Sequence, residues 1–390
     1  MNTLIRFFSD NTAYVCFLLT WAVQLFICRY YVKLRKFQKK QCREIKESSA
    51  NESVTVIVLS HNEADALRRN LPAILEQDHE SYEVIVIDMA STDNTADVLA
   101  EMESRYPHLR HSFIPTSSRY ISEERMAITI GVKAALYDLI LLTKADCRPR
   151  TSRWIQTMTA AFKQEKQIVL GYTDYAGDSL YRVRRMSFFR FFQQLMYLTW
   201  AVDHKAYRGD ICNMGYRKSF FMSHKGFADD FQLVEGSGDI LANYHSTINN
   251  TAVVLQHEAI IEQEIPNKRN WKEKLVNYME TRRHLKHSFM YRMKFNFIQS
   301  MPVISLFCCI GSVALSVIRQ QWIATGIFTA SFLALVIYIT ILLNHICKKT
   351  GIIRPGIAAY LYLVKIPFWH LNALLNYLSR PRRSFWKKGV

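Results

Sequence analysis

The eight cysteines of this chain include no Cys-x-x-Cys spacing, and several of them lie inside apolar runs. The sequence therefore indicates neither a zinc cage nor a disulfide framework, and buried reduced thiols, as in a cytosolic compartment, are the default. No nucleic-acid-binding module is visible either, and the basic residues are not interleaved with a stacking platform of the kind that single-strand binders have. With nucleic acid set aside, the formal net charge of +17 points to a membrane surface or an anionic substrate.

Charge is absent from three long apolar stretches, residues 12–28, 297–318 and 322–343. The first is followed at once by a cluster of Lys and Arg within residues 29–46. A signal peptide would carry its positive charges before the apolar stretch and a small-residue cleavage site after it. We therefore predict an uncleaved transmembrane anchor whose carboxyl side lies in the cytoplasm. The alternative is a buried helix of a soluble domain.

The two C-terminal stretches predict a transmembrane hairpin that returns to the cytoplasm at residues 348–349. Residues 358–378 are apolar too, but Lys365, Pro367 and His370 interrupt them, and we predict an interfacial helix there. If this segment spanned, the basic tail would end outside, against the positive-inside rule. The basic residues flank the membrane segments, so we expect them to contact anionic lipid. A transporter is disfavoured, because no repeated helix bundle is present and both C-terminal spans lack charge.

Between these segments the sequence predicts three buried strands, each ending in polar residues. The strands are residues 54–59, 83–87 and 140–143, and the polar tips include Glu63, Asp88 and Asp146. Helical patterns separate the strands, as expected for a half-Rossmann, mostly parallel sheet whose strand ends meet at one crevice. Acidic residues at strand tips are commonly ordinary turn and N-cap residues, but three tips at one edge favour a ligand site.

Four ordered motifs in this region resemble those of family 2 glycosyltransferases with the GT-A fold, in their membrane-attached bacterial branch. The motifs are Val-Ile-Val-Leu-Ser-His-Asn-Glu at residues 56–63, Val-Ile-Val-Ile-Asp-Met-Ala-Ser-Thr-Asp-Asn-Thr at 84–95, Ala-Ile-Thr-Ile-Gly-Val-Lys-Ala-Ala at 127–135 and Leu-Leu-Thr-Lys-Ala-Asp-Cys at 141–147. The likeness covers roughly residues 54–290. It implies an α/β GT-A domain between N-terminal and C-terminal transmembrane helices.

The resemblance implies a nucleotide-sugar site at the strand tips. Asn62 and Glu63 match the family's pair after the first strand, and Asp88 matches an acidic residue that contacts the nucleobase. Arg125 matches a basic residue near the diphosphate. By the same resemblance the donor is expected to be a UDP-sugar.

The family's metal-binding Asp-x-Asp motif is altered, because Lys144-Ala145-Asp146 stands in its place. Asp146 matches the direct ligand of Mg²⁺ or Mn²⁺, but a lone carboxylate beside an ammonium group is a poor divalent site. Two hypotheses follow. Either Lys144 neutralises the diphosphate as a point charge in place of the metal, or it pairs with Asp146 and the site is inactive.

The acceptor side departs from the family as well. Where the family has Gly-Asp-Asp-Asp, this chain has Gly236-Ser237-Gly238-Asp239. Asp239 is the predicted general base, with Glu235 and Asp229 as neighbours that could serve. In the segment that closes over the diphosphate, Trp271 and Lys274 match family positions, whereas Val276-Asn277 replaces an Arg-His pair.

The first hypothesis is a membrane-bound glycosyltransferase, of hexosyltransferase type and inverting, that moves a sugar from a nucleotide-sugar to a lipid-linked or membrane-proximal glycan. We expect it in the bacterial inner membrane, multi-pass, with its catalytic domain facing the cytoplasm, anionic lipid as a partner and enzymes of the same cell-envelope pathway nearby. The alternative is a catalytically degenerate scaffold or regulatory subunit. The expected parts are an anchor at 1–30, a basic linker at 31–53, the GT-A domain at 54–290, the hairpin at 291–345, and an interfacial helix with basic tail at 346–390.

Overall fold

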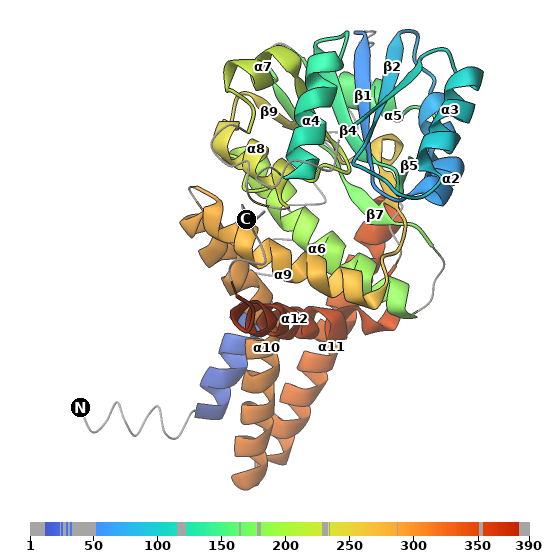
Figure 1. Cartoon of the computed structure of the whole chain (residues 1–390). Helices are drawn as coiled ribbons and strands as arrows, with labels where there is room; N and C mark the ends of the chain where they lie inside the picture. The colour runs from blue at the N-terminus through green and yellow to red at the C-terminus, as the bar shows by residue number, and fades with distance from the viewer. Residues whose placement is uncertain are drawn as a thin grey trace. The chain divides into compact units, whose positions relative to one another are not determined.

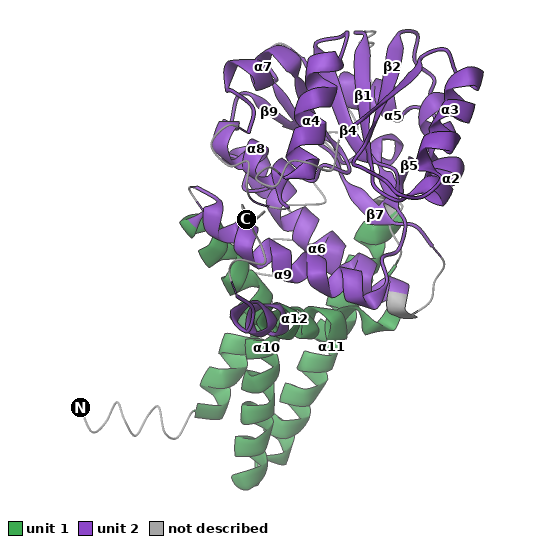
Figure 2. Cartoon of the chain, in the orientation of Figure 1, with its two compact units in different colours: residues 1–37, 289–371 green, residues 38–288, 372–390 purple. Residues whose placement is uncertain are grey.

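The structure of the chain is a computed structural model (Figure 1). It describes residues 12–23, 25, 29, 32, 52–114, 122–163, 165–177, 181–227, 233, 235–286, 288–350 and 354–381. Most of the predicted basic linker, Asp229 and nearly all of the basic tail lie outside these residues. The chain forms two compact units, residues 1–37 with 289–371 and residues 38–288 with 372–390 (Figure 2).

The second unit is built on a seven-stranded sheet with the strand order β3-β2-β1-β4-β8-β6-β9. Four neighbouring strands run parallel: β1 (Val54–Ser60), β2 (Tyr82–Asp88), β3 (Leu109–Phe113) and β4 (Leu139–Lys144). The antiparallel strand β8 (Met214–Arg217) joins β4 to β6 (Ile168–Leu170), which pairs in parallel with β9 (Thr251–Val253). A smaller sheet has the order β5-β10-β7, with bounds Cys147–Pro149, Ile261–Gln263 and Thr173–Tyr175.

Helices connect these strands and cover the sheet (Figure 1). Those of the parallel half are α2 (Ala64–Leu75), α3 (Thr95–Arg105), α4 (Glu123–Ala134) and α5 (Trp154–Thr159). Those that follow are α6 (Tyr181–Asp203), α7 (Lys218–Ser223), α8 (Ser237–His245), the 3₁₀ turn η1 (His257–Ala259) and α9 (Lys268–His284). Because β1 and β4 are apolar on both faces, both faces need such a cover.

The register of the parallel strands decides which polar tips become neighbours. Ser60 at the end of β1 pairs with Asp88 at the end of β2, and Leu59 pairs with Lys144 at the end of β4. The loops that follow these strands therefore leave the sheet at one edge, as the sequence predicted.

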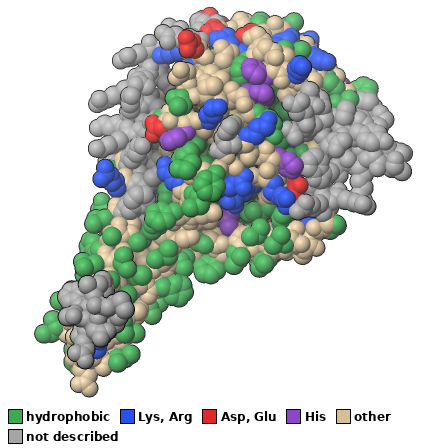
Figure 3. Space-filling model, turned by 90° about the vertical axis from the view of Figure 1, so that its left-hand side faces the viewer, with side chains coloured by type: hydrophobic (Ala, Val, Ile, Leu, Met, Phe, Trp, Pro, Cys, Tyr) green, Lys and Arg blue, Asp and Glu red, His purple; other side chains and the backbone are tan. Residues whose placement is uncertain are grey.

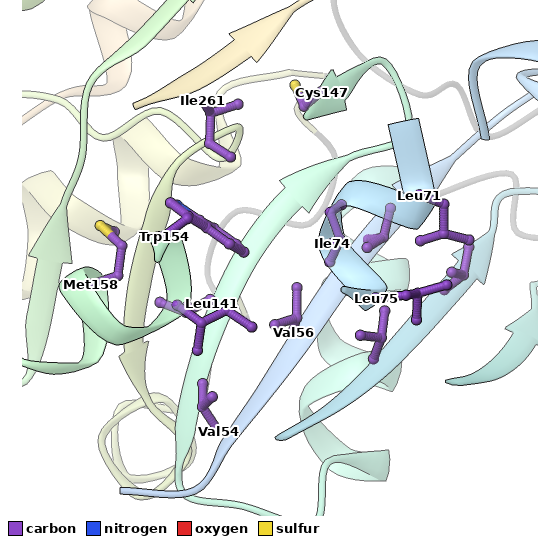
Figure 4. Close-up of a cluster of buried hydrophobic side chains, with 14 of the residues drawn as sticks. Val54, Val56, Leu71, Ile74, Leu75, Leu141, Cys147, Trp154, Met158 and Ile261 are labelled. Carbon is purple, nitrogen blue, oxygen red and sulfur yellow. The ribbon is translucent and has the colours of Figure 1, made fainter. Parts of the chain in front are cut away.

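The core of this unit contains the side chains of β1, β4 and the helices packed on them (Figure 4). Trp154 at the start of α5 is fully buried among Leu141, Met158 and Ile261. Its indole Nε1 donates to Asn213 Oδ1 at 3.0 Å, and Asn213 Nδ2 donates to the carbonyls of Tyr172 and Ala259 at 2.7 and 2.8 Å. These bonds join α5 to the second half of the sheet.

The first unit is helical, with α10 (Phe289–Ile318), α11 (Trp322–Thr350), the turn η2 (Gly356–Ala358) and the first part of α12 (Ala359–Leu378). Within the described residues, Phe289–Ile318 and Trp322–Lys348 are the helices long and apolar enough to cross a membrane. Only 33% and 28% of their most apolar windows are buried, and hydrophobic side chains gather on the lower part of Figure 3. The predicted hairpin is confirmed as two apolar helices, whose role in a membrane stays a prediction.

The predicted N-terminal anchor is described only in part, and its role stays a prediction. Its continuously described part, Thr12–Val23, is shorter than the ~20 residues that a spanning helix needs. Within the first unit, Phe17 of this helix stacks on Phe328 of α11, with ring centroids 4.6 Å apart. The last residues of α12 belong to the other unit, where Arg380 Nη2 donates to Glu273 Oε1 on α9 at 2.9 Å.

Candidate active site

The loops after β1 and β2 are bound to each other by their own polar groups. Asn62, in the left-handed conformation with φ +53°, accepts a hydrogen bond from the Thr92 backbone N–H at Oδ1 over 2.7 Å. Its own N–H donates to Ser91 Oγ at 2.8 Å, and the Ser91 N–H donates to Asp88 Oδ1 at 3.1 Å. Asn62 and Asp88 therefore shape the crevice edge, and their predicted nucleotide contacts stay predictions.

Glu63 and Asp146 lie in one hollow of about 450 Å³, together with Asn62 and Asp93. Burial, together with the nearby Asp146 carboxylate, raises the pKa of Glu63 to about 7, and the Lys144 ammonium acts in the opposite direction. Glu63 thus holds a proton in part near neutral pH, as groups in functional clefts often do.

We expect Glu63→Gln to stabilise the chain above pH 7 and to have little effect at pH 4.5. A folded-state pKa raised from 4.5 to about 7 gives stability that is full below pH 4.5 and is lost as the pH rises through 7. Glutamine never ionises, so it avoids that loss. The melting temperature of variant and wild type, measured in one detergent from pH 4.5 to 8, checks this, with the exposed Glu165→Gln as control. A constant difference across the range would contradict it.

Lys144 is paired with a residue that the sequence did not indicate. Its Nζ donates to Glu124 Oε2 at 2.9 Å, and Ser237 Oγ donates to Glu124 Oε1 at 2.6 Å. The predicted alternative partner, Asp146, instead accepts from Gln263 Nε2 at 2.7 Å. Glu124 and Asp146 hold the pKa of Lys144 well above its usual range, against the effect of burial. The side chain remains 27% exposed, so its ammonium group can meet a ligand.

The residues around Asp146 do not fit a divalent metal ion. Asp146 interacts with two ammonium groups, because it raises the pKa of both Lys144 and Lys274. No group of three or more His, Cys, Asp or Glu side chains with metal-binding geometry occurs in the described part of the chain. A hard cation needs several oxygen ligands and would be repelled by the two ammonium groups.

A second cavity of about 240 Å³ opens beside Lys144, lined by α6, α8 and α9. Several aromatic residues line it, and the predicted residue Trp271 is among them, with its ring 5.6 Å from that of Phe189. Lys274, one turn further along α9, lines the same cavity, and its pKa is raised by Asp146 although burial opposes this. The structure thus brings Lys144, Trp271 and Lys274 together.

Asp239 lines this cavity too, but it is already bound. Its Oδ1 accepts from Arg208 Nε at 2.9 Å, and the guanidinium group of Arg208 lies 3.8 Å from the centre of the Tyr278 ring. Burial raises the pKa of Asp239, and Arg208 lowers it. The predicted role of Asp239 as base stays a prediction.

Arg125 lies apart from the other predicted residues. It is fully buried on α4, with its guanidinium carbon 5.5 Å from the centre of the Phe227 ring, and it is not among the residues that line the two cavities. The neighbouring Glu124 lines the site in its place. The sequence signal for Glu124 was its position in the Glu123-Glu124-Arg125 run, which on its own indicates a helix N-terminus.

Comparison with known proteins gives the family. Residues 55–224 match the profile described as Glycosyl transferase family 2. A poly-beta-1,6-N-acetyl-D-glucosamine synthase from Staphylococcus aureus is 27% identical over 95 residues, which are 24% of this chain and 22% of that protein. An uncharacterized glycosyltransferase from Nostoc sp. is 33% identical over 54 residues, 14% of this chain and 17% of that protein. The matched segments thus span about a fifth of these relatives.

Among solved structures, a mannosyltransferase from Pyrobaculum calidifontis, in complex with GDP-mannose and Mn²⁺, is similar with a TM-score of 0.53 and 14% identity. The match covers 93% of this chain and 99% of that one, and it supports the fold. The strand order, the polar strand tips and the family match agree. This chain carries a family 2 glycosyltransferase domain with the GT-A fold, as its sequence motifs predicted.

Proposed function

We propose that the chain transfers a hexose from a UDP-sugar to a lipid-linked or membrane-proximal glycan, with inversion, and that Lys144 replaces the divalent metal. The observation that carries this proposal is the Lys144–Glu124 pair at the end of β4. It places a permanent cation where the family's motif has a carboxylate. Asn62, Glu63 and Asp88 would hold the nucleotide, and the buried Arg125, which lines neither cavity, is not among the proposed contacts.

The chemistry requires charge neutralisation as the nucleoside diphosphate leaves. The bond between the sugar C1 and the diphosphate oxygen breaks, and the electron pair stays on the diphosphate. Lys144 and Lys274 supply two ammonium groups near Asp146 that can stabilise this developing charge. The aromatic residues that line the cavity, with Trp271 among them, offer an apolar surface for a sugar ring, and a cavity carboxylate takes the proton of the acceptor hydroxyl.

A membrane location for this reaction is supported by the apolar helices α10 and α11, whose surfaces are largely exposed. Exposed apolar helices of this length are stable in a bilayer and costly in water. In the proposed arrangement the first unit lies in the bacterial inner membrane. The second unit, which carries the proposed active site and is called the catalytic unit below, faces the cytoplasm. The acceptor is then a lipid-borne or nearby glycan of the cell envelope.

The test is calorimetric titration of the full chain in detergent with UDP, with GDP as the comparison. Each titration is run in EDTA and again with Mn²⁺. We expect UDP to bind with an affinity that Mn²⁺ changes less than about twofold. Binding that requires Mn²⁺ would overturn the role of Lys144. Failure to bind UDP would overturn the proposed function, whether or not GDP binds.

A degenerate scaffold is the second candidate, and the buried Arg208–Asp239 pair favours it because that pair occupies the predicted base. A scaffold of this kind would bind UDP without releasing UDP from any UDP-sugar. Incubation of the chain with UDP-glucose and UDP-N-acetylglucosamine in lipid vesicles, followed by assay of free UDP, separates the two functions.

A further inference from the structure

Four carboxylates line the cavity beside Lys144, and three of them are bound to cations. Glu124 accepts from Lys144 Nζ, Asp210 from Arg190 Nη2 and Asp239 from Arg208 Nε, each at 2.9 Å. The fourth, Glu235, accepts from a neutral group, Asn277 Nδ2, at 2.8 Å.

An ion pair weakens a carboxylate as a base, because the cation stabilises the charged form and lowers its affinity for a proton. The pairing with Arg190 lowers the pKa of Asp210 to about 2 although burial opposes this. The pKa of Glu124 is lowered in the same way by Lys144. These two groups are poor acceptors of a proton from a sugar hydroxyl.

Asp239 and Glu235 differ in the solvent exposure of their side chains and in their hydrogen-bond partners. Asp239 is only 5% exposed, whereas Glu235 is half-buried at the cavity wall. A proton on Asp239 would also leave Arg208 without its buried counterion, which is costly. Burial raises the pKa of Glu235, Glu124 acts in the same direction, and Lys144 and Lys274 act against it.

The backbone holds Glu235 in this place. Gly236, the next residue, is the N-cap of helix α8 and has φ +91°, a conformation that favours glycine. A Cβ on Gly236 would lie 2.3 Å from Thr281 Cγ2 on α9, so only glycine allows this close approach. The turn brings Glu235 against α9, where Asn277 binds its carboxylate.

We propose that Glu235 is the general base of the transfer and that Asn277 positions it. The proposal rests on the proposed function. The acceptor hydroxyl gives its proton to the Glu235 carboxylate as its oxygen bonds to the sugar C1. The bond from C1 to the diphosphate breaks, with its electron pair going to the diphosphate oxygen. Glu235 then releases the proton to water. Asp239 holds Arg208 in the cavity wall.

The test compares Glu235→Gln with the matched variant Asp239→Asn in the full chain. UDP binding is measured by calorimetry, folding by melting temperature, and turnover by release of UDP from UDP-glucose and UDP-N-acetylglucosamine between pH 5 and 9. We expect Glu235→Gln to bind UDP within about twofold of wild type, to melt as wild type does, and to lose about 10²- to 10⁴-fold in kcat together with the acidic limb of the pH profile. Asp239→Asn should keep that limb.

Asn277→Ala tests whether Asn277 positions Glu235. This variant should shift the acidic limb of the pH profile while UDP binding is retained, whereas a purely structural role of Asn277 would leave that limb in place. The inference is overturned if Glu235→Gln keeps kcat within about threefold of wild type, or if Asp239→Asn alone removes the acidic limb. A wild type that binds UDP but releases none from either donor would also overturn it and leave nucleotide binding standing. Failure of wild type to bind UDP overturns the proposed function itself.

Discussion

Replacement of Lys144 by alanine should weaken UDP binding about 100-fold, which corresponds to about 2.8 kcal/mol. The reason is that Lys144 replaces a carboxylate of the family's Asp-x-Asp motif with an ammonium group, and charge-assisted contacts to phosphate are strong. The substitution also leaves the Glu124 carboxylate without its counterion beside the diphosphate. Both effects have the same sign, because an anion loses an attractive partner and gains a repulsive one. Calorimetry on the full chain in EDTA measures the loss.

Two further variants separate these effects. Lys272→Ala removes an exposed lysine of α9 and should leave UDP binding unchanged. Lys144→Ala combined with Glu124→Gln removes the repulsion, so it should recover part of the lost affinity and of the melting temperature. If the single variant binds UDP as wild type does, Lys144 does not neutralise the diphosphate.

Lys144→Asp extends the same test, since it restores the family's Asp-x-Asp and sets two Asp carboxylates close to Glu124. We expect this variant to bind UDP only in the presence of Mn²⁺, since the added carboxylates outweigh the one remaining ammonium group, that of Lys274, and would repel a diphosphate. Binding that ignores the metal would show that the remaining lysine, Lys274, is sufficient.

Trp154→Ala is expected to destabilise the catalytic unit by about 4 kcal/mol, because truncation of a buried tryptophan leaves a large cavity. The indole is fully buried and is the donor to Asn213 Oδ1, so the variant also leaves a buried acceptor without this bond. A loss of this size lowers the melting temperature by about 10 °C in a domain of this length.

The control for this variant is Trp154→Phe, which keeps most of the ring volume and removes only the N–H donor. It should cost about 1–3 kcal/mol, the penalty for an unsatisfied buried acceptor. Thermal unfolding of the full chain in detergent compares the three proteins. Equal melting temperatures for Trp154→Ala and wild type would mean that the packing of Trp154 and its hydrogen bond to Asn213 do not limit stability.

Local patterns in the sequence were sufficient for three of the parallel strands of the large sheet, β1, β2 and β4. The uninterrupted apolar runs of β1, β2 and β4 predicted strands buried on both faces, and the structure confirms them with polar tips at one edge. The apolar stretches 297–318 and 322–343 likewise lie inside α10 and α11. Such patterns are readable because burial of a strand or helix depends on residues that are close in sequence.

The partners of the charged residues were decided by the tertiary structure alone. Lys144 pairs with Glu124, which enters the site from α4, and Asp146 binds Gln263, which is 117 positions away. The sequence named Asp239 as the base, but it could not show that Arg208, from the segment after α6, binds that carboxylate while the Glu235 carboxylate accepts from Asn277. A buried charge must be paired, but the sequence alone offers several oppositely charged residues as its partner. Only the packing of loops from distant parts of the chain selects the partner, and that selection sets which carboxylate is left to accept a proton.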